Sequence, residues 1–300
     1  MRICYSINVH AGSAAKSSIH AIAELFAAHG FSPRIIEPKA DDDIVALAKE
    51  AIEQKYDVVV AGGGDGTANV VASALVGNDA VRLGIIPLGT LAHFACDAEI
   101  STDLSLAADN IILGEVKSVD VGAVNGQIFL NNSSVGLYSA IVKLREGLQQ
   151  SGYAKWSAAS FATIRIMARF RRLHLVLHSA SGSTVKRRTA LLFVGNNAYE
   201  TGLLQIGKRL ELDQGKLWIA MPNSSSRWPL FIALVSEMVG RKKKEDVCKS
   251  DATHLVVASN QTHLQVAIDG EVRHLKPPLN YKSRPKALRI LAPRTTGEVG

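Results

Sequence analysis

Apolar stretches of strand length alternate with amphipathic stretches of helical length over the first third of the chain. The strand-like stretches are residues 3–8, 32–36, 58–61 and 83–86. The helix-like stretches are residues 19–29, 42–53 and 68–76. This alternation predicts a parallel sheet with covering helices, in which ligands bind beyond the carboxyl ends of the strands. Three of these ends carry polar or glycine-rich segments, at residues 8–13, 62–67 and 87–90.

The pattern changes near residue 119, where an antiparallel region is expected to begin. Two alternating segments, 119–124 and 127–130, are separated by Asn125-Gly126, a strong signal for a two-residue hairpin. Further strands are predicted at 173–178, 189–194, 216–221, 254–258, 264–268 and 287–292, and helices near 155–170 and 229–240. We therefore expect an α/β domain with a parallel sheet over residues 1–118 and an antiparallel, β-rich domain over residues 119–284.

Composition and charge limit the classes of protein to which the chain can belong. A chain of 300 residues with 47% hydrophobic content can form two cores. The net charge of +7 favours an anionic partner, such as a nucleotide, an acidic membrane surface or nucleic acid, without choosing among them. Three scattered cysteines indicate neither a disulfide framework nor a zinc site, which fits a cytoplasmic protein. The N-terminus predicts a strand rather than a leader, and no segment reaches the roughly 18 uncharged residues of a membrane-spanning helix, so any membrane contact is expected to be peripheral.

The segment 59–67, Val-Val-Ala-Gly-Gly-Gly-Asp-Gly-Thr, is the most informative in the chain. Adjacent glycines have no Cβ to hold a polyphosphate away, so backbone N–H groups can reach phosphate oxygens, and Asp65 can hold a cation or a ribose hydroxyl. The segment is neither a lysine-bearing P-loop nor the G-x-G-x-x-G dinucleotide fingerprint. It predicts a nucleotide phosphate loop. The alternative is a plain glycine-rich turn between strand and helix.

Three motifs occur in a recognisable order: residues 62–67, Pro87-Leu88-Gly89-Thr90, and Asp269-Gly270-Glu271. Weaker motifs accompany them at Asn8, 119–122 with Asn125-Gly126, 129–132, 194–197 and 212–217. Together they resemble the diacylglycerol kinase catalytic family, which includes bacterial lipid kinases and sphingosine and ceramide kinases. The resemblance extends over nearly the whole chain.

The resemblance implies an ATP-dependent kinase with its active site in the cleft between a nucleotide-binding α/β domain and the β-rich domain. It also implies that the tail, residues 285–300, packs back on the first domain. Carried over by position, the nucleotide-binding residues would be Asn8, Gly62, Gly63, Gly64, Asp65, Gly66, Thr67, Asn69, Gly89 and Thr90. Asp65 and Asp120 would hold catalytic Mg²⁺ with the phosphates, and Glu271 would be the base that takes the proton of the lipid hydroxyl. Two carboxylates, a metal ion and a glycine cradle supply most of what phosphoryl transfer needs.

Two positions depart from the family pattern. The family often continues after the Pro-x-Gly-Thr motif with Asn-Asp, where this chain has Ala92-His93. His93 could ligate a metal or donate to a phosphate, and a structural histidine is an equal alternative. A second-domain Mg²⁺ site of the family uses an Asp where this chain has Gln214, a poorer Mg²⁺ ligand. Neighbouring Asp213 could substitute, and we do not predict a metal ion there.

The function that these residues predict is transfer of the γ-phosphate of ATP to a lipid hydroxyl at a membrane surface, most simply that of diacylglycerol. Sphingoid bases, ceramide-like lipids and phosphatidylglycerol are alternative acceptors. A non-catalytic nucleotide-binding regulator is a different hypothesis, and a kinase of NAD is another, because NAD kinases share a Gly-Gly-Asp-Gly-Thr loop. Asp269-Gly270-Glu271 alone is equally consistent with a plain hairpin turn. No nucleic-acid partner is expected, and a homodimer is possible.

Overall fold

A computed structural model describes most of both halves of the chain. The described residues are 1–7, 14–36, 41–89, 92–136, 172–179, 182–200, 208–209, 211–223 and 247–294. They form two compact units. Unit 1 comprises Met1–Val121, Glu211–Gln214 and Arg284–Gly300, and unit 2 comprises Gly122–Leu210 and Gly215–Ser283.

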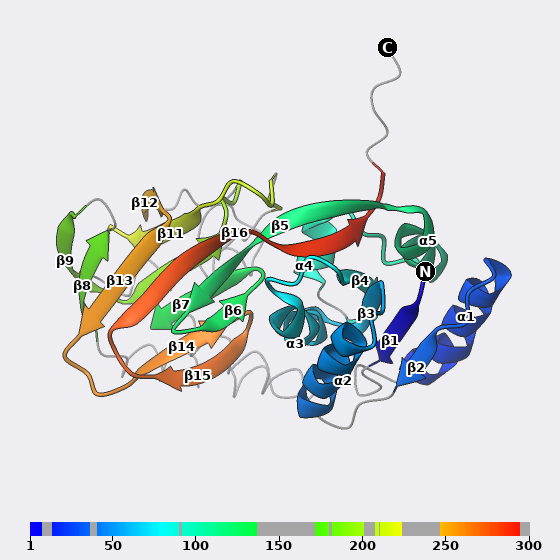
Figure 1. Cartoon of the computed structure of the whole chain (residues 1–300). Helices are drawn as coiled ribbons and strands as arrows, with labels where there is room; N and C mark the ends of the chain where they lie inside the picture. The colour runs from blue at the N-terminus through cyan, green and yellow to red at the C-terminus, as the bar shows by residue number, and fades with distance from the viewer. Residues whose placement is uncertain are drawn as a thin grey trace, which may run out of the picture. The chain divides into compact units, whose positions relative to one another are not determined.

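A parallel sheet forms the centre of unit 1, in the strand order β2-β1-β3-β4 (Figure 1). The strands are β1 (Ile3–Ile7), β2 (Arg34–Ile36), β3 (Val58–Gly63) and β4 (Arg82–Pro87). Every residue of β3 is buried, as expected for a central strand covered on both faces. The end of β16 (Leu279–Ala292) adds to β4 in parallel, with Ile290 opposite Leu83.

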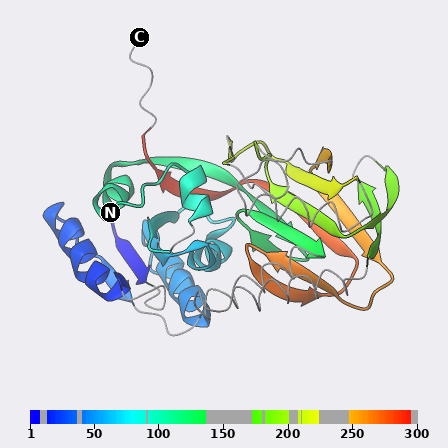
Figure 2. The ribbon, with the colours of Figure 1, turned by 180° about the vertical axis from the view of Figure 1, so that it is seen from behind.

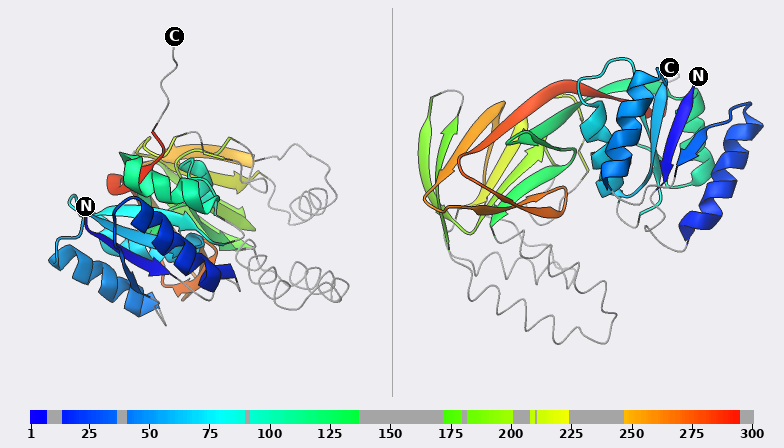
Figure 3. Two further views of the ribbon diagram at one scale, coloured as in Figure 1. Left: turned by 90° about the vertical axis from the view of Figure 1, so that its right-hand side faces the viewer. Right: turned by 60° about the horizontal axis from the view of Figure 1, so that its bottom comes forward.

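Helices cover both faces of this sheet. The helices are α1 (Ala14–Ala28), α2 (Asp41–Glu53), α3 (Asp65–Leu75), the short α4 (His93–Asp97) and α5 (Leu104–Leu113). The right-hand view of Figure 3 shows α2 on one side of the strands, and α1 and α5 on the other. Helix α2 packs on α3, and α1 packs on α5. The predicted parallel sheet with covering helices is confirmed.

Unit 2 is built from antiparallel strands. One sheet has the order β12-β11-β10-β7-β14-β15, and a second set of neighbours is β16-β13-β8-β9 (Figure 2). Their bounds are β5 (Glu115–Val124), β6 (Gln127–Phe129), β7 (Asn132–Gly136), β8 (Leu173–Ser179), β9 (Thr184–Thr189), β10 (Leu191–Asn196), β11 (Leu217–Pro222), β12 (Val247–Ala252), β13 (His254–Ser259), β14 (Leu264–Ile268) and β15 (Glu271–Leu275). Leu175, Leu192, Val257 and Val266 belong to one buried cluster that both sets of strands share. The predicted antiparallel, β-rich region is confirmed.

The Asn125-Gly126 hairpin forms as predicted. Both residues have positive φ, +47° and +85°, which a two-residue turn of this type requires. The predicted strand 189–194 corresponds to β10, which begins at Leu191; its first residue, Thr189, is the last residue of β9. Strands β7, β9, β12 and β15 were not predicted, nor was the first half of β16. The predicted helices at 155–170 and 229–240 lie outside the described residues.

Segment 211–214 belongs to unit 1, although the sequence analysis placed it in the second domain. The N–H of Asp120 donates to the carbonyl oxygen of Leu212 at 2.7 Å, which ties this segment to β5. Among the helices that the structure describes, none is long and apolar enough to span a membrane.

Candidate active site

Three loops of unit 1 begin at the same edge of the parallel sheet. Gly62 lies opposite Ile7 of β1 on one side and Ile86 of β4 on the other, and Gly63 lies opposite Pro87. The segments that follow β1, β3 and β4 therefore leave the sheet together, as the sequence analysis predicts. Asn8, after β1, and Thr90, after β4, lie outside the described residues.

The glycine loop passes directly from β3 into α3. Gly64 is the N-cap of α3 in an extended conformation (φ −93°, ψ −169°), without a side-chain cap. The carbonyl oxygen of Gly63 accepts the N–H of Leu88 at 2.9 Å, which ties this loop to the one after β4. A Cβ on Gly63 would lie 2.4 Å from Oγ1 of the buried Thr67, so the close turn requires glycine. The first N–H groups of a helix have no partner within the helix, and they make this a suitable place for a phosphate.

Asp65 links the glycine loop to α4. Its carboxylate accepts the N–H groups of His93 and Phe94, both at 3.1 Å. The N-cap of α4 is Ala92, which has no side chain for capping, so Asp65 supplies the oxygen atoms that the start of α4 needs. Asp65 is half-buried, and a carboxylate can accept about four hydrogen bonds or ligand contacts. It can therefore still bind a cation.

Three further residues of the predicted nucleotide set lie in α3 or shortly after β4. Asn69 is one helical turn after Asp65 and accepts a hydrogen bond from Ser73 Oγ at 3.4 Å. Gly66 lies in the first turn of α3, and Gly89 follows the end of β4; both are half-buried. The side chain of His93 is exposed.

Asp120 lies on β5 and is fully buried. One oxygen of its carboxylate accepts the N–H of Lys286 at 2.8 Å. Together with its own N–H bond to Leu212, this joins three segments of unit 1 that are far apart in the sequence. These contacts fix the position of the carboxylate. No group of three or more Asp, Glu, His or Cys side chains suited to a metal occurs within the described part of the chain.

Glu271 belongs to unit 2 and is the first residue of β15. Asp269-Gly270 forms the two-residue turn between β14 and β15, with positive φ at both residues, +44° and +93°. Glu271 is exposed and forms an ion pair with Arg273 at 2.7 Å. The tripeptide therefore forms a hairpin turn and also exposes the carboxylate of Glu271.

Asp269 has a role that the sequence analysis missed. Its carboxylate accepts three backbone N–H groups, from Leu130 at 2.7 Å and from Asn131 and Asn132 at 2.9 Å each. Its own N–H donates to the carbonyl oxygen of Asn132 at 2.9 Å. Four hydrogen bonds thus fix the turn that presents Glu271 against the β6–β7 connection.

Arg209 was also missed, and it supports the same connection from the other side. Its side chain is fully buried and donates to the carbonyl oxygens of Leu130 and Asn196, at 2.6 Å and 3.0 Å, and to Oδ1 of Asn131 at 2.8 Å. Tyr199 donates to the carbonyl oxygen of Asn131 at 2.9 Å. The motifs at 129–132 and 194–197 thus meet in one buried hydrogen-bonded network.

Gln214, the second departure from the family pattern, has a defined partner. Its amide nitrogen donates to Oε2 of Glu211 at 3.0 Å. The amide of Gln214 is therefore held beside a carboxylate of the same segment.

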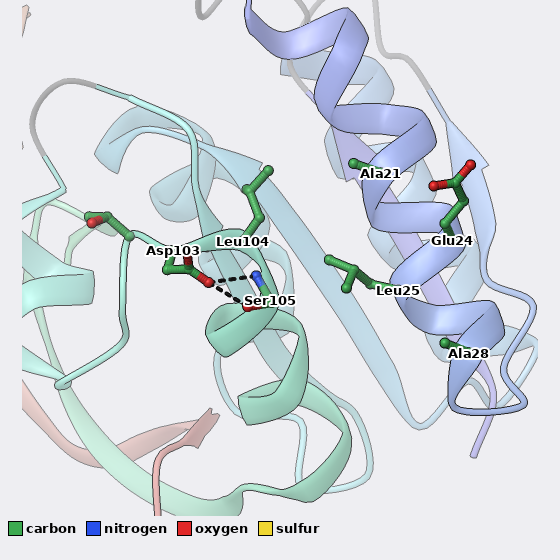
Figure 4. A pocket seen from close by; sticks show the side chains of 8 residues that line it. Ala21, Glu24, Leu25, Ala28, Asp103, Leu104 and Ser105 are labelled. Carbon is green, nitrogen blue, oxygen red and sulfur yellow. Dashed lines mark hydrogen bonds between the residues drawn. The ribbon is translucent and has the colours of Figure 1, made fainter.

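One open hollow of about 710 Å³ lies between the C-terminal half of α1 and the start of α5 (Figure 4). Ala21, Leu25 and Ala28 line one side, and Leu104 lines the other. Asp103 caps α5, and the hydrogen bonds from Ser105 hold the pKa of its carboxyl below the ordinary value. None of the lining residues belongs to the three loops, so this hollow is not the candidate site.

Comparisons with known proteins agree with this geometry. Residues 2–124 match the model of the diacylglycerol kinase catalytic domain. The matched residues include the glycine loop and Asp120. Proteins named diacylglycerol kinase from Staphylococcus aureus strains RF122 / ET3-1 and JH9 are each 25% identical over 256 residues, covering 84% of this chain and 79% of theirs.

Solved structures show the same fold. A crystal structure described as a diacylglycerol kinase from Bacillus anthracis str. Sterne has a TM-score of 0.71 at 20% identity, and covers 98% of this chain and 97% of its own. Another from the same organism has a TM-score of 0.76 at 22% identity and covers 98% of both chains.

Proposed function

We propose that the protein transfers the γ-phosphate of ATP to the hydroxyl of diacylglycerol, giving phosphatidic acid. The observation that supports this most is the glycine turn between β3 and α3. It leaves no room for a Cβ at Gly63 and places Asp65 in the first helical turn, where it ties the turn to α4. A phosphate loop needs both this close backbone approach and a nearby carboxylate for the metal ion of the nucleotide.

In this proposal the N–H groups at the start of α3 bind phosphate oxygens, and Thr67 and the neighbouring glycines shape the turn around them. Asn8, Asn69, Gly89 and Thr90 complete the nucleotide site. Asp65 holds Mg²⁺ together with the phosphates. The ion would neutralise the charge of the phosphate oxygens during transfer.

Asp120 was expected to hold the same ion. Because Asp120 is fully buried and hydrogen-bonded to Lys286, we propose that it mainly positions the strands and loops of unit 1.

Glu271 is proposed to accept the proton of the lipid hydroxyl. The O–H bond breaks as the oxygen attacks the γ-phosphorus, the bond from phosphorus to the oxygen of ADP breaks, and the proton goes to the carboxylate. Glu271 suits this role because it is exposed on a turn that Asp269 fixes through four hydrogen bonds. Since the acceptor lies in a bilayer, the protein is proposed to work at a membrane surface.

An acceptor panel tests the proposal. The protein is incubated with γ-³²P-ATP and Mg²⁺, and with diacylglycerol, sphingosine, ceramide, phosphatidylglycerol or NAD, lipids being given in neutral detergent micelles. We expect label in phosphatidic acid, and its loss in Asp65→Asn. Asp79→Asn, the same change at an exposed position outside the loops, should keep the activity. Preferential labelling of NAD or of another lipid would overturn the choice of acceptor. ATP binding without any transfer would favour the regulator.

A further inference from the structure

One face of unit 2 is strongly basic. Strands β9, β8 and β13 and residues 279–283 of β16 lie side by side in that order (Figure 1). Their inward residues, such as Leu175, Val257 and Tyr281, are part of the buried core. Alternate residues of a strand point to the opposite face, so the intervening residues form an outward surface.

Cross-strand pairing gathers cationic and titratable side chains on that outward surface. His174 lies opposite Arg188, Val176 opposite Lys186, and His254 opposite Lys282. Residues directly opposite each other in an antiparallel pair share a face, so these partners lie together. The hydrogen bond between Nδ1 of His178 and Oγ1 of Thr184, at 2.9 Å, confirms the arrangement for a fourth pair. We name this surface the basic sheet face: His174, His178, Lys186, Arg188 and Lys282, all of them exposed.

The described strand residues that form the basic sheet face include no acidic residue. Residues 172–179, 182–189, 254–259 and 279–283 contain neither Asp nor Glu. Lys186, Arg188 and Lys282 are exposed. Like charges on one sheet face destabilise the fold, and a surface of one sign attracts a partner of the other sign. The face is therefore complementary to an anionic partner.

The residues in the middle of the basic sheet face suit contact with a bilayer better than contact with nucleic acid. Val176, Val256 and Ala258 lie there, half-buried, between the basic side chains. Proteins that bind single-stranded nucleic acid without sequence preference stack bases on aromatic side chains. The outward positions of these described strand residues hold no Phe, Tyr or Trp, because Tyr281 points into the core.

We propose that the basic sheet face docks the protein on a bilayer that contains anionic phospholipid. The inference rests on the proposed function in one respect, namely that a lipid kinase must reach a substrate held in a membrane. Lys186, Arg188 and Lys282 contact the phosphate groups of the lipids, and the half-buried valines face the interface. Each Lys or Arg near an anionic surface strengthens binding by about fivefold, so three should contribute about 100-fold.

The test compares two triple variants of the full chain. One removes the three cations of the face, as Lys186→Gln, Arg188→Gln and Lys282→Gln. The matched control removes three other exposed cations, as Lys49→Gln, Lys216→Gln and Lys249→Gln, so that both proteins have the same net charge. Thermal unfolding verifies that both fold, and the face variant should be no less stable because like charges have been removed.

Co-sedimentation with vesicles gives the main result. With phosphatidylcholine vesicles that contain about one-third phosphatidylglycerol, we expect the face variant to bind about 100-fold more weakly and the control to stay within about threefold of wild type. Equal losses in both variants, or no loss in the face variant, would overturn the proposal. Tighter binding of wild type to double-stranded DNA than to these vesicles, lost in the face variant, would also overturn it and would assign the face to nucleic acid.

A second assay separates this inference from the proposed function. In neutral detergent micelles, both triple variants should phosphorylate diacylglycerol as fast as wild type, because none of the changed residues belongs to the proposed site. Failure of wild type to phosphorylate any lipid, with the vesicle result intact, would contradict the kinase and leave the docking face standing. Activity in micelles with no selective loss of vesicle binding would contradict the docking face alone.

Discussion

Asp269→Asn tests whether the carboxylate of Asp269 fixes the turn that presents Glu271. Asparagine has nearly the same shape and tolerates the positive φ of this position, so the substitution isolates the charge and the hydrogen bonds. In the wild type, one oxygen accepts the N–H groups of Asn131 and Asn132, and the other accepts that of Leu130. In the variant an NH₂ group must face one of these donors.

The expected loss follows from the number of contacts. A hydrogen bond to a charged group contributes about 1.5–3 kcal/mol, and the variant loses one such bond outright and weakens two. Because Asp269 is only half-buried, water can replace part of the loss, and we expect the free energy of unfolding to fall by about 2 kcal/mol. Urea unfolding followed by circular dichroism measures this change.

Two controls make the result specific. Asp251→Asn changes an exposed carboxylate of the same unit, and Glu271→Gln removes an exposed ion pair with Arg273; each should cost about 0.5 kcal/mol or less. Asp269→Asn should thus lose stability, whereas Glu271→Gln should lose activity with little change in stability. A loss below about 0.5 kcal/mol for Asp269→Asn would contradict this role of the Asp269 carboxylate.

Three further predictions concern the glycine loop and the core of unit 2. Gly63→Ala forces a Cβ against Thr67, so ATP affinity should fall about tenfold or more and stability by about 1–3 kcal/mol; unchanged affinity by titration calorimetry would contradict the phosphate loop. Arg209→Leu leaves the buried acceptors of Leu130, Asn196 and Asn131 without their donor and should cost about 3 kcal/mol in urea unfolding; near-neutral stability would show that the network is dispensable. Burial raises the pKa of Tyr281 above its ordinary value of about 10. The folded protein therefore keeps this proton at a pH where the unfolded chain loses it, so the free energy of unfolding falls as the pH rises beyond about 10. The thermal midpoint of wild type should therefore fall more steeply between about pH 9 and about pH 11 than that of Tyr281→Phe, and parallel curves would be the contrary result.

The sequence predicted those parts of the fold whose signal is local. The buried run of β3 and the Asn125-Gly126 turn are recognisable because burial on both faces and positive φ each restrict the residue types over a few positions. Strand β9, with Lys186, Arg187 and Arg188 in succession, has no alternating pattern, since it lies at the edge of its sheet and is mostly exposed.

The same limit applies to the candidate site. The glycine loop and Asp65 could be predicted because the chemistry and the turn occupy neighbouring residues. The contacts of Asp269 lie 137 to 139 residues away in sequence, and Arg209 contacts an asparagine 78 residues away, so no local pattern indicates them. The carboxylate of Asp120 likewise accepts the N–H of Lys286, 166 residues later, a contact that its own segment does not indicate.

The most direct test of the central proposal is a single transfer assay with γ-³²P-ATP, Mg²⁺ and diacylglycerol in neutral micelles. It compares wild type, Glu271→Gln and, as a matched change at an exposed glutamate of the same unit, Glu200→Gln. We expect labelled phosphatidic acid from wild type and Glu200→Gln, and a rate reduced by about 100-fold or more in Glu271→Gln, the range expected for loss of a general base. Equal labelling by all three proteins would contradict the role of Glu271, and no labelling by wild type in spite of measurable ATP binding would contradict the proposed kinase activity.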